Sequence, residues 1–287
     1  MRNFYILFIS LFINHVFAQN NLSAGDIAVV SFRNSSPDHF EFVVLTGFTT
    51  SETISFTNEG WLNTGSFRGA EGTLVWVAPN TGVACGTIVS VDAANSTSSV
   101  GTVTSNTLTF GPSGDQLIAY QGAHQTPKVI FAINNEGNAV WQSNASSFSD
   151  SALPTGLING ETAVAVNEYN NTVYNGVVTN DTKSNILAAI CDASNWEGAN
   201  GSNRYLSYDG PSFTITDCTT LSSDAFVLSS QLGVHIENRS INVATGEIVG
   251  VYNIFGQVVE NHDLSSGIYL AVVSIGQQTI TLKVMIP

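Results

Sequence analysis

Short runs of alternating apolar and polar residues, each bounded by Gly, Asn, Ser or Pro, recur along most of this chain. In residues 53–57, Ile54 and Phe56 would point to one face of an extended strand and the threonines to the other. Because no regular series of helices separates these runs, the pattern predicts an all-β protein built as an antiparallel sandwich. The clearest predicted strands are residues 27–32, 40–46, 53–57, 73–77, 87–91, 116–120, 128–133, 162–166 and 212–216.

One segment has a helical pattern, at residues 184–193. Ser184 can cap its first turn, and Ile186 and Ile190 share a face four residues apart. Only 10% of residues are charged, so the Glu and Lys pairs that support exposed helices are scarce elsewhere. The polar surface must come from Ser, Thr, Asn and Gly, which suits strands and turns.

The charge balance excludes whole classes of partner. Eight Lys and Arg oppose 22 Asp and Glu, for a net charge of -14. Nucleic acids and anionic membranes are bound by clustered cations, so we expect neither as a partner.

The first residues are typical of a secretory signal peptide. Arg2 precedes an apolar run over residues 4–13, and Ala18 offers a small residue for cleavage, which predicts a signal over residues 1–18. A membrane anchor is the alternative, but the run is shorter than the roughly 20 apolar residues that cross a bilayer. We expect the mature chain to be soluble once exported, and extracellular or on the outer cell surface.

Export to an oxidising compartment permits disulfides. The chain has three cysteines, Cys85, Cys191 and Cys218, so an intrachain bridge leaves one of them over. We predict that Cys191, which closes the helical segment, pairs with Cys218 after the strand at 212–216. Cys85 is then interpreted as a buried small hydrophobe.

A polar stretch divides the chain into two predicted β-domains. The main domain spans residues 20–218, the linker spans 219–225, and a small second domain spans 226–287. In the second domain, strands at 248–254, 268–275 and 279–286 are separated by the turn of residues 255–257 and a hairpin about residues 276–278.

The second domain resembles the C-terminal sorting domain of type IX secretion cargo. Three blocks carry the resemblance, at residues 251–259, 264–272 and 281–286, and they contain Gly256, Gly267, Tyr269 and Lys283. The resemblance implies a small immunoglobulin-like sandwich, recognised by the type IX translocon and its processing machinery. Whether the mature protein is then anchored or released stays open.

The main domain is similar to a widespread secreted bacterial β-domain and, more loosely, to lamin-tail-like immunoglobulin sandwiches. The similarity rests on blocks spread over residues 24–200, among them 56–61, 67–73, 114–122 and 152–157. Neither resemblance brings an active site with it, so no catalytic role is carried over to this chain.

No common catalytic motif is present. The Gly-x-Ser-x-Gly elbow, His-Glu-x-x-His, the phosphate-binding loop and the EF-hand loop are all absent. Of the five histidines, only His39 and His124 could serve as an acid or base in the main domain, and both follow turn residues. We therefore assign no catalytic residue and lean against an enzyme.

Two sets of side chains are candidates for binding. Asp38, Glu41, Asn58 and Glu59 lie near strand ends, where hard oxygen ligands could hold calcium; solvated turn residues are the alternative.

The other candidate set is an aromatic and charged cluster. Trp61, Arg68 and Glu71 could present an exposed indole to a sugar ring or a protein partner, although Arg68 and Glu71 could simply pair and fix their loop. Trp76 alternates with Leu74 and is expected in the core.

These observations predict a secreted or cell-surface binding or structural protein whose main domain has no assigned ligand; a glycan or a surface protein could be its partner. An extracellular polysaccharide-active hydrolase, which would need a pair of carboxylates, is the alternative. An adhesin or surface-layer component is the second.

Overall fold

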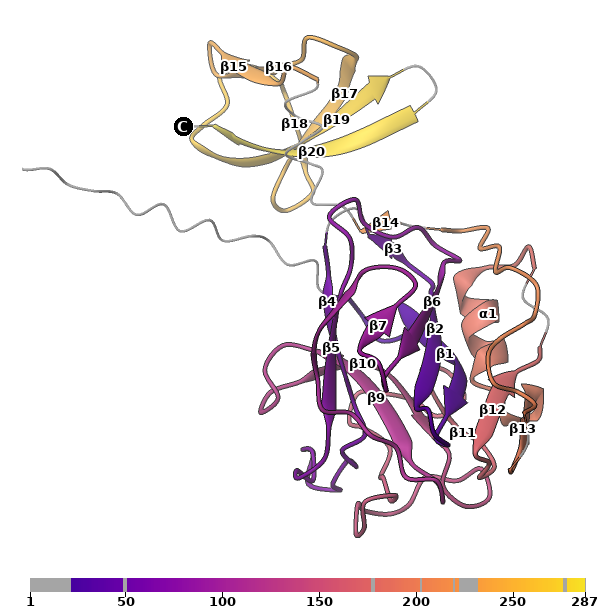
Figure 1. Ribbon diagram of the computed structural model, residues 1–287. Coiled ribbons are helices and arrows are strands. Elements are labelled where there is room, and N and C mark those ends of the chain that lie inside the picture. The colour runs from indigo at the N-terminus through magenta and orange to yellow at the C-terminus, as the bar shows by residue number, and fades with distance from the viewer. Residues whose placement is uncertain are drawn as a thin grey trace, which may run out of the picture.

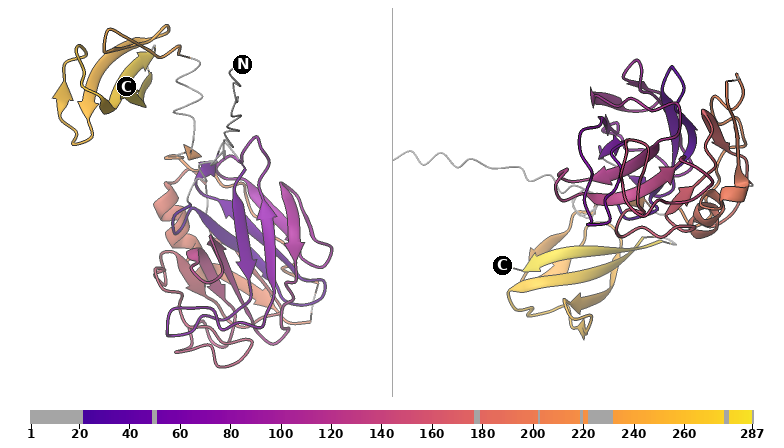
Figure 2. Two further views of the ribbon diagram at one scale, coloured as in Figure 1. Left: turned by 90° about the vertical axis from the view of Figure 1, so that its left-hand side faces the viewer. Right: turned by 90° about the horizontal axis from the view of Figure 1, so that it is seen from below.

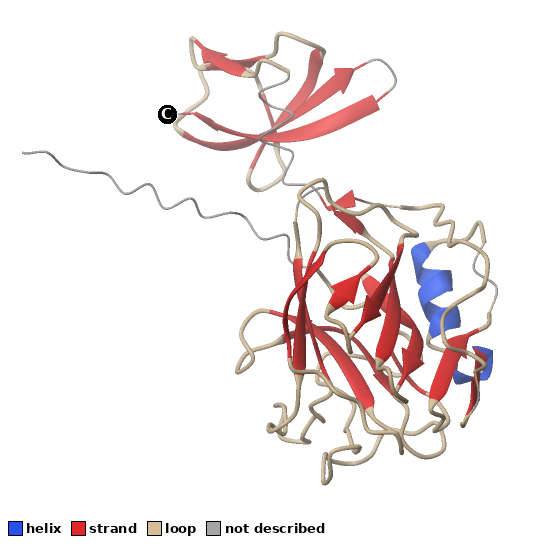
Figure 3. Ribbon diagram, in the orientation of Figure 1, coloured by secondary structure: helices blue, strands red, loops and turns tan. Residues whose placement is uncertain are grey.

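The computed structural model describes residues 22–48, 51–176, 179–201, 203–218, 220–221, 232–275 and 278–286. The predicted signal peptide and most of the predicted linker lie outside these residues. In the described part, strands dominate and one α-helix and a 3-10 turn lie along one side (Figure 3). The predicted all-β class is confirmed. None of the helices described here has the length and apolar character needed to cross a bilayer.

The main unit is a sandwich of two six-stranded sheets (Figures 1 and 2). Among the described residues, neighbouring strands in these sheets are antiparallel except β10 and β11. The first sheet has the order β13 (Trp196–Ala199), β12 (Asn171–Tyr174), β1 (Ile27–Arg33), β2 (His39–Val44), β6 (Ile88–Asp92) and β7 (Thr97–Ser98). The second has the order β11 (Ala163–Ala165), β10 (Lys128–Asn134), β9 (Gln116–Gln121), β4 (Thr53–Thr57), β5 (Thr73–Val77) and β8 (Thr102–Asn106).

Aromatic side chains fill the space between the two sheets. The ring of Phe42 on β2 lies 5.1 Å from that of Phe56 on β4 and 5.2 Å from that of Trp76 on β5, measured between centroids. All three are fully buried, as is Ile54. The alternation of β4 therefore places its apolar residues in the core as predicted, and Trp76 is a core residue.

The second sheet is covered on its outer face as well. Ile118 and Tyr120 of β9 point away from the main core and pack with Trp61, Phe67 and Leu157 from loops. Trp61 is only 3% exposed, and its indole N–H donates to the Thr155 hydroxyl at 3.3 Å. The expectation of an exposed indole for ligand stacking is wrong, because the second sheet needs this ring to cover its outer face.

The helix α1 spans Lys183–Ile190, with Thr182 rather than Ser184 as its cap. The Thr182 hydroxyl accepts the backbone N–H of Asn185 at 3.3 Å. Ile186 and Ile190 are buried as predicted, and a 3-10 turn, η1 (Ala193–Asn195), follows the helix.

The disulfide joins Cys85 to Cys218, which corrects the predicted bridge between Cys191 and Cys218. Their Cα atoms lie 6.1 Å apart. The segment before Cys218 runs against the Cys85 loop so closely that a Cβ on Gly86 would lie 2.3 Å from the Phe213 carbonyl oxygen. Cys191 is a free thiol buried in the main core, and this burial raises its pKa to about 12.

Residues 212–216 form no strand, which corrects that prediction. Ile215 makes a single bridge to Asp181, and the buried Phe213 packs against Tyr174 with the two rings stacked. The alternating residues there are packed through their side chains, but their backbone forms no ladder of hydrogen bonds with a partner strand. Further along, β14 (Thr220–Leu221) pairs in parallel with β3 (Gly47–Phe48), so pairing to the main unit reaches into the segment predicted as a linker.

The C-terminal unit is a small β-sandwich with a core of its own. A hairpin of β15 (His235–Glu237) and β16 (Ser240–Asn242) packs on a four-stranded sheet. The sheet has the order β18 (Val258–Val259), β17 (Glu247–Asn253), β19 (Gly267–Ile275) and β20 (Gln278–Ile286). Its core includes Leu232, Ile241, Val251, Leu264, Ala271 and Leu282.

The four residues singled out in the sorting motif lie at different points of this unit. Gly256 has φ +77°, so the predicted turn needs a residue free of a Cβ. The Asn253 side-chain oxygen closes that turn by accepting two backbone N–H groups. Gly267 starts β19 in extended backbone, the Tyr269 hydroxyl bonds to Ser265, and Lys283 is exposed on β20.

Candidate functional site

A pocket with a volume of 590 Å³ lies at one end of the second sheet. Because β4, β5, β8 and β9 are antiparallel neighbours, the end of β4, the start of β5, the end of β8 and the start of β9 meet there. Asn58, residues 70–72, residues 109–115 and residues 147–149 line the pocket. This volume lies within the range of small-molecule sites in proteins.

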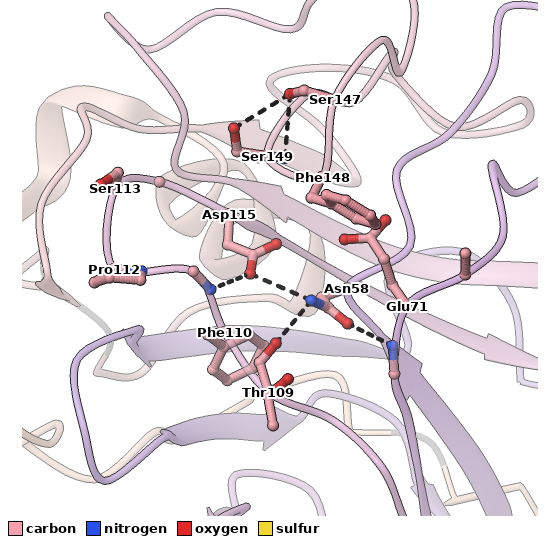
Figure 4. Close-up of a pocket in the computed structure, with 14 residues that line it drawn as sticks. Asn58, Glu71, Thr109, Phe110, Pro112, Ser113, Asp115, Ser147, Phe148 and Ser149 are labelled. Atoms are coloured by element: carbon pink, nitrogen blue, oxygen red, sulfur yellow. Dashed lines mark hydrogen bonds between the residues drawn. The ribbon is translucent and has the colours of Figure 1, made fainter.

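Asn58 holds the floor of the pocket together (Figure 4). Its amide nitrogen donates to the Thr109 carbonyl at 2.8 Å and to Asp115 Oδ2 at 3.3 Å. Its amide oxygen accepts the backbone N–H of Gly72 at 3.0 Å. Gly72 is needed at this point, because a Cβ there would lie 2.2 Å from the Thr107 carbonyl oxygen. One buried amide thus joins three segments of the chain.

Asp115 is a buried carboxyl that fixes the loop before β9. Besides Asn58, it accepts the backbone N–H of Gly111 at 2.7 Å and of Gln116 at 2.8 Å. Burial raises the pKa of Asp115 to about 8, although all these donors act in the opposite direction. Both of its oxygens are therefore already engaged by the protein.

Glu71 is the second titratable group of the pocket, and its side chain is 4% exposed. Burial raises the pKa of Glu71 to about 7, against the opposing effects of the Gly60 N–H and of Arg68. Arg68 Nη1 lies 3.8 Å from Glu71 Oε2, so the predicted pairing of these two residues is confirmed. In Figure 4 the Glu71 and Asp115 carboxyl groups face one another.

Phe148 places an aromatic ring at the pocket, and the residue is 59% exposed. Gln116, which is fully buried, donates from Nε2 to the Phe148 carbonyl at 3.0 Å. The Arg68 guanidinium carbon lies 4.3 Å from the ring centroid. Neither Phe148 nor Asp115 was predicted as a site residue; the signal for Phe148 was a single aromatic residue among the serines of residues 146–149.

The two raised carboxyl pKa values predict that stability falls as pH rises. The folded protein holds protons on Glu71 and Asp115 that the unfolded chain releases above its ordinary carboxyl pKa of about 4. Their stabilising effect is complete below that value and is lost as pH rises through about 7 and 8. We expect the Tm measured by circular dichroism to fall from pH 5 to pH 9.

Glu71→Gln should flatten that fall, because glutamine keeps an acceptor for the Gly60 N–H without titrating. Glu161→Gln, which changes an exposed carboxylate, is the matched control and should leave the slope unchanged. A Tm that stayed constant or rose over this range would contradict the prediction.

The predicted calcium set is not assembled. Asp38 Oδ2 accepts the Phe110 N–H at 2.9 Å, and Glu41 accepts the Tyr208 N–H. Within the described ranges, no group of three or more His, Cys, Asp and Glu side chains could hold a metal ion. Of the four residues, Asn58 belongs to the pocket and Asp38 only reaches its edge through Phe110.

The fourth calcium candidate, Glu59, pairs with His124. His124 Nε2 lies 3.0 Å from Glu59 Oε1, and its ring stacks on Phe67 at 4.9 Å. The second main-domain histidine, His39, bonds to the Ser90 hydroxyl at 2.8 Å and lies on β2. Neither histidine lines the pocket. Of the three predicted ligand residues, Glu71 lines the pocket and Arg68 contacts its lining, whereas Trp61 is buried in the cluster on the outer face of the second sheet.

No protein-family model matches the chain, and no curated protein matches it. Among solved structures, HBP35 of Porphyromonas gingivalis matches with 13% identity and a TM-score of 0.18. The match covers 91% of this chain and 63% of that one. At this TM-score the likeness supports no conclusion about fold or function.

Proposed function

We propose that this chain is an exported cell-surface protein whose main sandwich binds a ligand in the pocket at the end of the second sheet. The observation that carries the binding role is the pocket itself, in which an exposed ring, Phe148, faces buried polar groups. The loops that form it are joined by hydrogen bonds from Asn58 and Asp115, so the site is preformed.

The route of export is the second part of the proposal. We propose that residues 1–18 direct the chain through the Sec pathway and that residues 226–287 are a type IX sorting domain. Support comes from the three sequence blocks and from a C-terminal unit whose described residues have a separate hydrophobic core. A unit with its own core can fold and be recognised apart from its cargo.

Deleting residues 226–287 should trap a folded main domain in the periplasm. The full chain should be found in the medium or on the outer surface, as measured by fractionation and protease accessibility of intact cells. The same residues fused to a reporter with a signal peptide should carry that reporter outside. If the truncated chain still reached the surface in normal amounts, the proposed route would be refuted, while the binding role would be unaffected.

A polysaccharide-active hydrolase is the second candidate, and the facing carboxyl groups of Glu71 and Asp115 favour it. The engagement of both Asp115 oxygens opposes it, because an acid or nucleophile must give up such bonds to act. Release of new reducing ends from a neutral polysaccharide, lost in Glu71→Gln, would favour the hydrolase.

A further inference from the structure

Phe148 is an exposed ring that the protein holds in a fixed position. Single exposed apolar side chains are common and by themselves mean nothing. Here the backbone is held by the amide of the fully buried Gln116, and one face of the ring lies against Arg68. The turn that carries it is closed by a hydrogen bond from the Ser146 hydroxyl to Asp150. A ring held in this way loses little conformational entropy when a ligand packs on it.

The polar groups near the ring can still accept hydrogen bonds. Both N–H groups of the Asn58 amide are used, but its oxygen accepts only the Gly72 N–H in the described contacts and has a second lone pair. Glu71 accepts the Gly60 N–H through Oε2, and its side chain lines the same pocket as the ring (Figure 4). Ser147 and Ser149 add hydroxyl groups that both donate and accept.

The charge of the pocket favours an uncharged ligand. The Arg68 cation contacts the lining, where it is shared between Glu71 and the Phe148 ring. Burial holds the carboxyl pKa values of Glu71 and Asp115 at about 7 and 8, so the two groups carry little negative charge below neutral pH. A cationic ligand would therefore gain little electrostatic attraction in the pocket. An anionic ligand would be disfavoured, because it would lie beside two buried carboxyl groups.

A fixed ring beside acceptors and hydroxyl groups, with little net charge, matches one chemical class. A pyranose has an apolar C–H face and several hydroxyl groups, and it carries no charge. We propose that the pocket binds a neutral sugar residue of an oligosaccharide, with the apolar face of the sugar on Phe148 and its hydroxyl groups donating to Glu71 and Asn58. This inference rests on the proposed binding function and names its ligand class.

The test measures binding of defined oligosaccharides to the purified full-length secreted chain by isothermal titration calorimetry. The neutral probes are cellohexaose, xylohexaose and mannohexaose. Trigalacturonic acid is the acidic probe, and glucosamine hexaose is the cationic one. We expect at least one neutral probe to bind, and we expect Phe148→Ala to weaken that binding at least tenfold. Phe148→Trp should restore it, because it keeps an aromatic platform.

Phe255→Ala is the matched control, since Phe255 is also an exposed phenylalanine, at 82%, but lies in the C-terminal unit. It should leave binding unchanged. Neutral probes that all fail to bind at millimolar concentration, or that bind Phe148→Ala as well as the parent chain, would overturn the inference. Binding of only a charged probe that depends on Phe148 would also overturn the ligand class, while leaving the proposed binding function standing.

Discussion

Cys218→Ala is expected to lower the free energy of unfolding of the main sandwich by about 2–5 kcal/mol. The bridge to Cys85 spans 133 residues, and a closed loop of this length removes much of the conformational entropy of the unfolded chain. For a unit of this size, such a loss corresponds to a Tm lower by about 4–20 °C. Thermal and urea unfolding without reductant measure the change.

The three cysteines allow an internal control. Cys85→Ala and the double variant should lose as much stability as Cys218→Ala, because each breaks the same bond. Cys191→Ala removes only a buried thiol and should cost about 1 kcal/mol or less. The denatured, unreduced parent chain should show one reactive thiol. If Cys191→Ala lowered the free energy of unfolding strongly and Cys85→Ala left it unchanged, the bridge would be assigned to the wrong pair of cysteines.

Asn58→Ala should be the most damaging single change in the pocket, at about 3 kcal/mol of unfolding free energy. It leaves the Gly72 N–H and the Thr109 carbonyl without their partner and takes a donor from Asp115. Each unsatisfied buried group costs about 1–3 kcal/mol. Urea unfolding at pH 6 measures the loss.

Two further variants sharpen this prediction. Asn63→Ala, an exposed residue on the same loop, should change stability by no more than about 0.5 kcal/mol. Asn58→Asp keeps an acceptor for the Gly72 N–H but places a second carboxyl group beside Asp115. Its loss of unfolding free energy should therefore grow as pH rises. If Asn58→Ala and Asn63→Ala behaved alike, the amide would not be what joins the loops.

The strands with clean alternation could be predicted to the residue. β4 (Thr53–Thr57) and β5 (Thr73–Val77) agree with the predicted bounds, because period two is imposed locally by the pleat. β12 (Asn171–Tyr174) was missed because its polar residues, with their side chains buried, hide the pattern. Residues 212–216 alternate in the same way but lack a partner strand, which only the tertiary structure decides.

The pocket could be predicted only in part. Arg68 and Glu71 are three residues apart, so their pairing could be predicted from the sequence. Asp115 and Phe148 come from loops far along the chain, and nothing local shows that these loops converge on Asn58. The predicted disulfide was wrong for the same reason, since the spacing of cysteines along the chain does not determine which of them pair.

The Cys85–Cys218 bridge also decides how the main sandwich would respond to mechanical tension. A pull on the chain beyond Cys218 passes through the disulfide directly into the loop before β6. The segment between the two cysteines, which are 133 residues apart in the sequence, then cannot be stretched, because the disulfide joins its two ends covalently. Both the pocket segments after residue 85 and the helix α1 lie inside this closed loop. Tension applied between the two ends of the chain would therefore bypass these elements and pass through the disulfide.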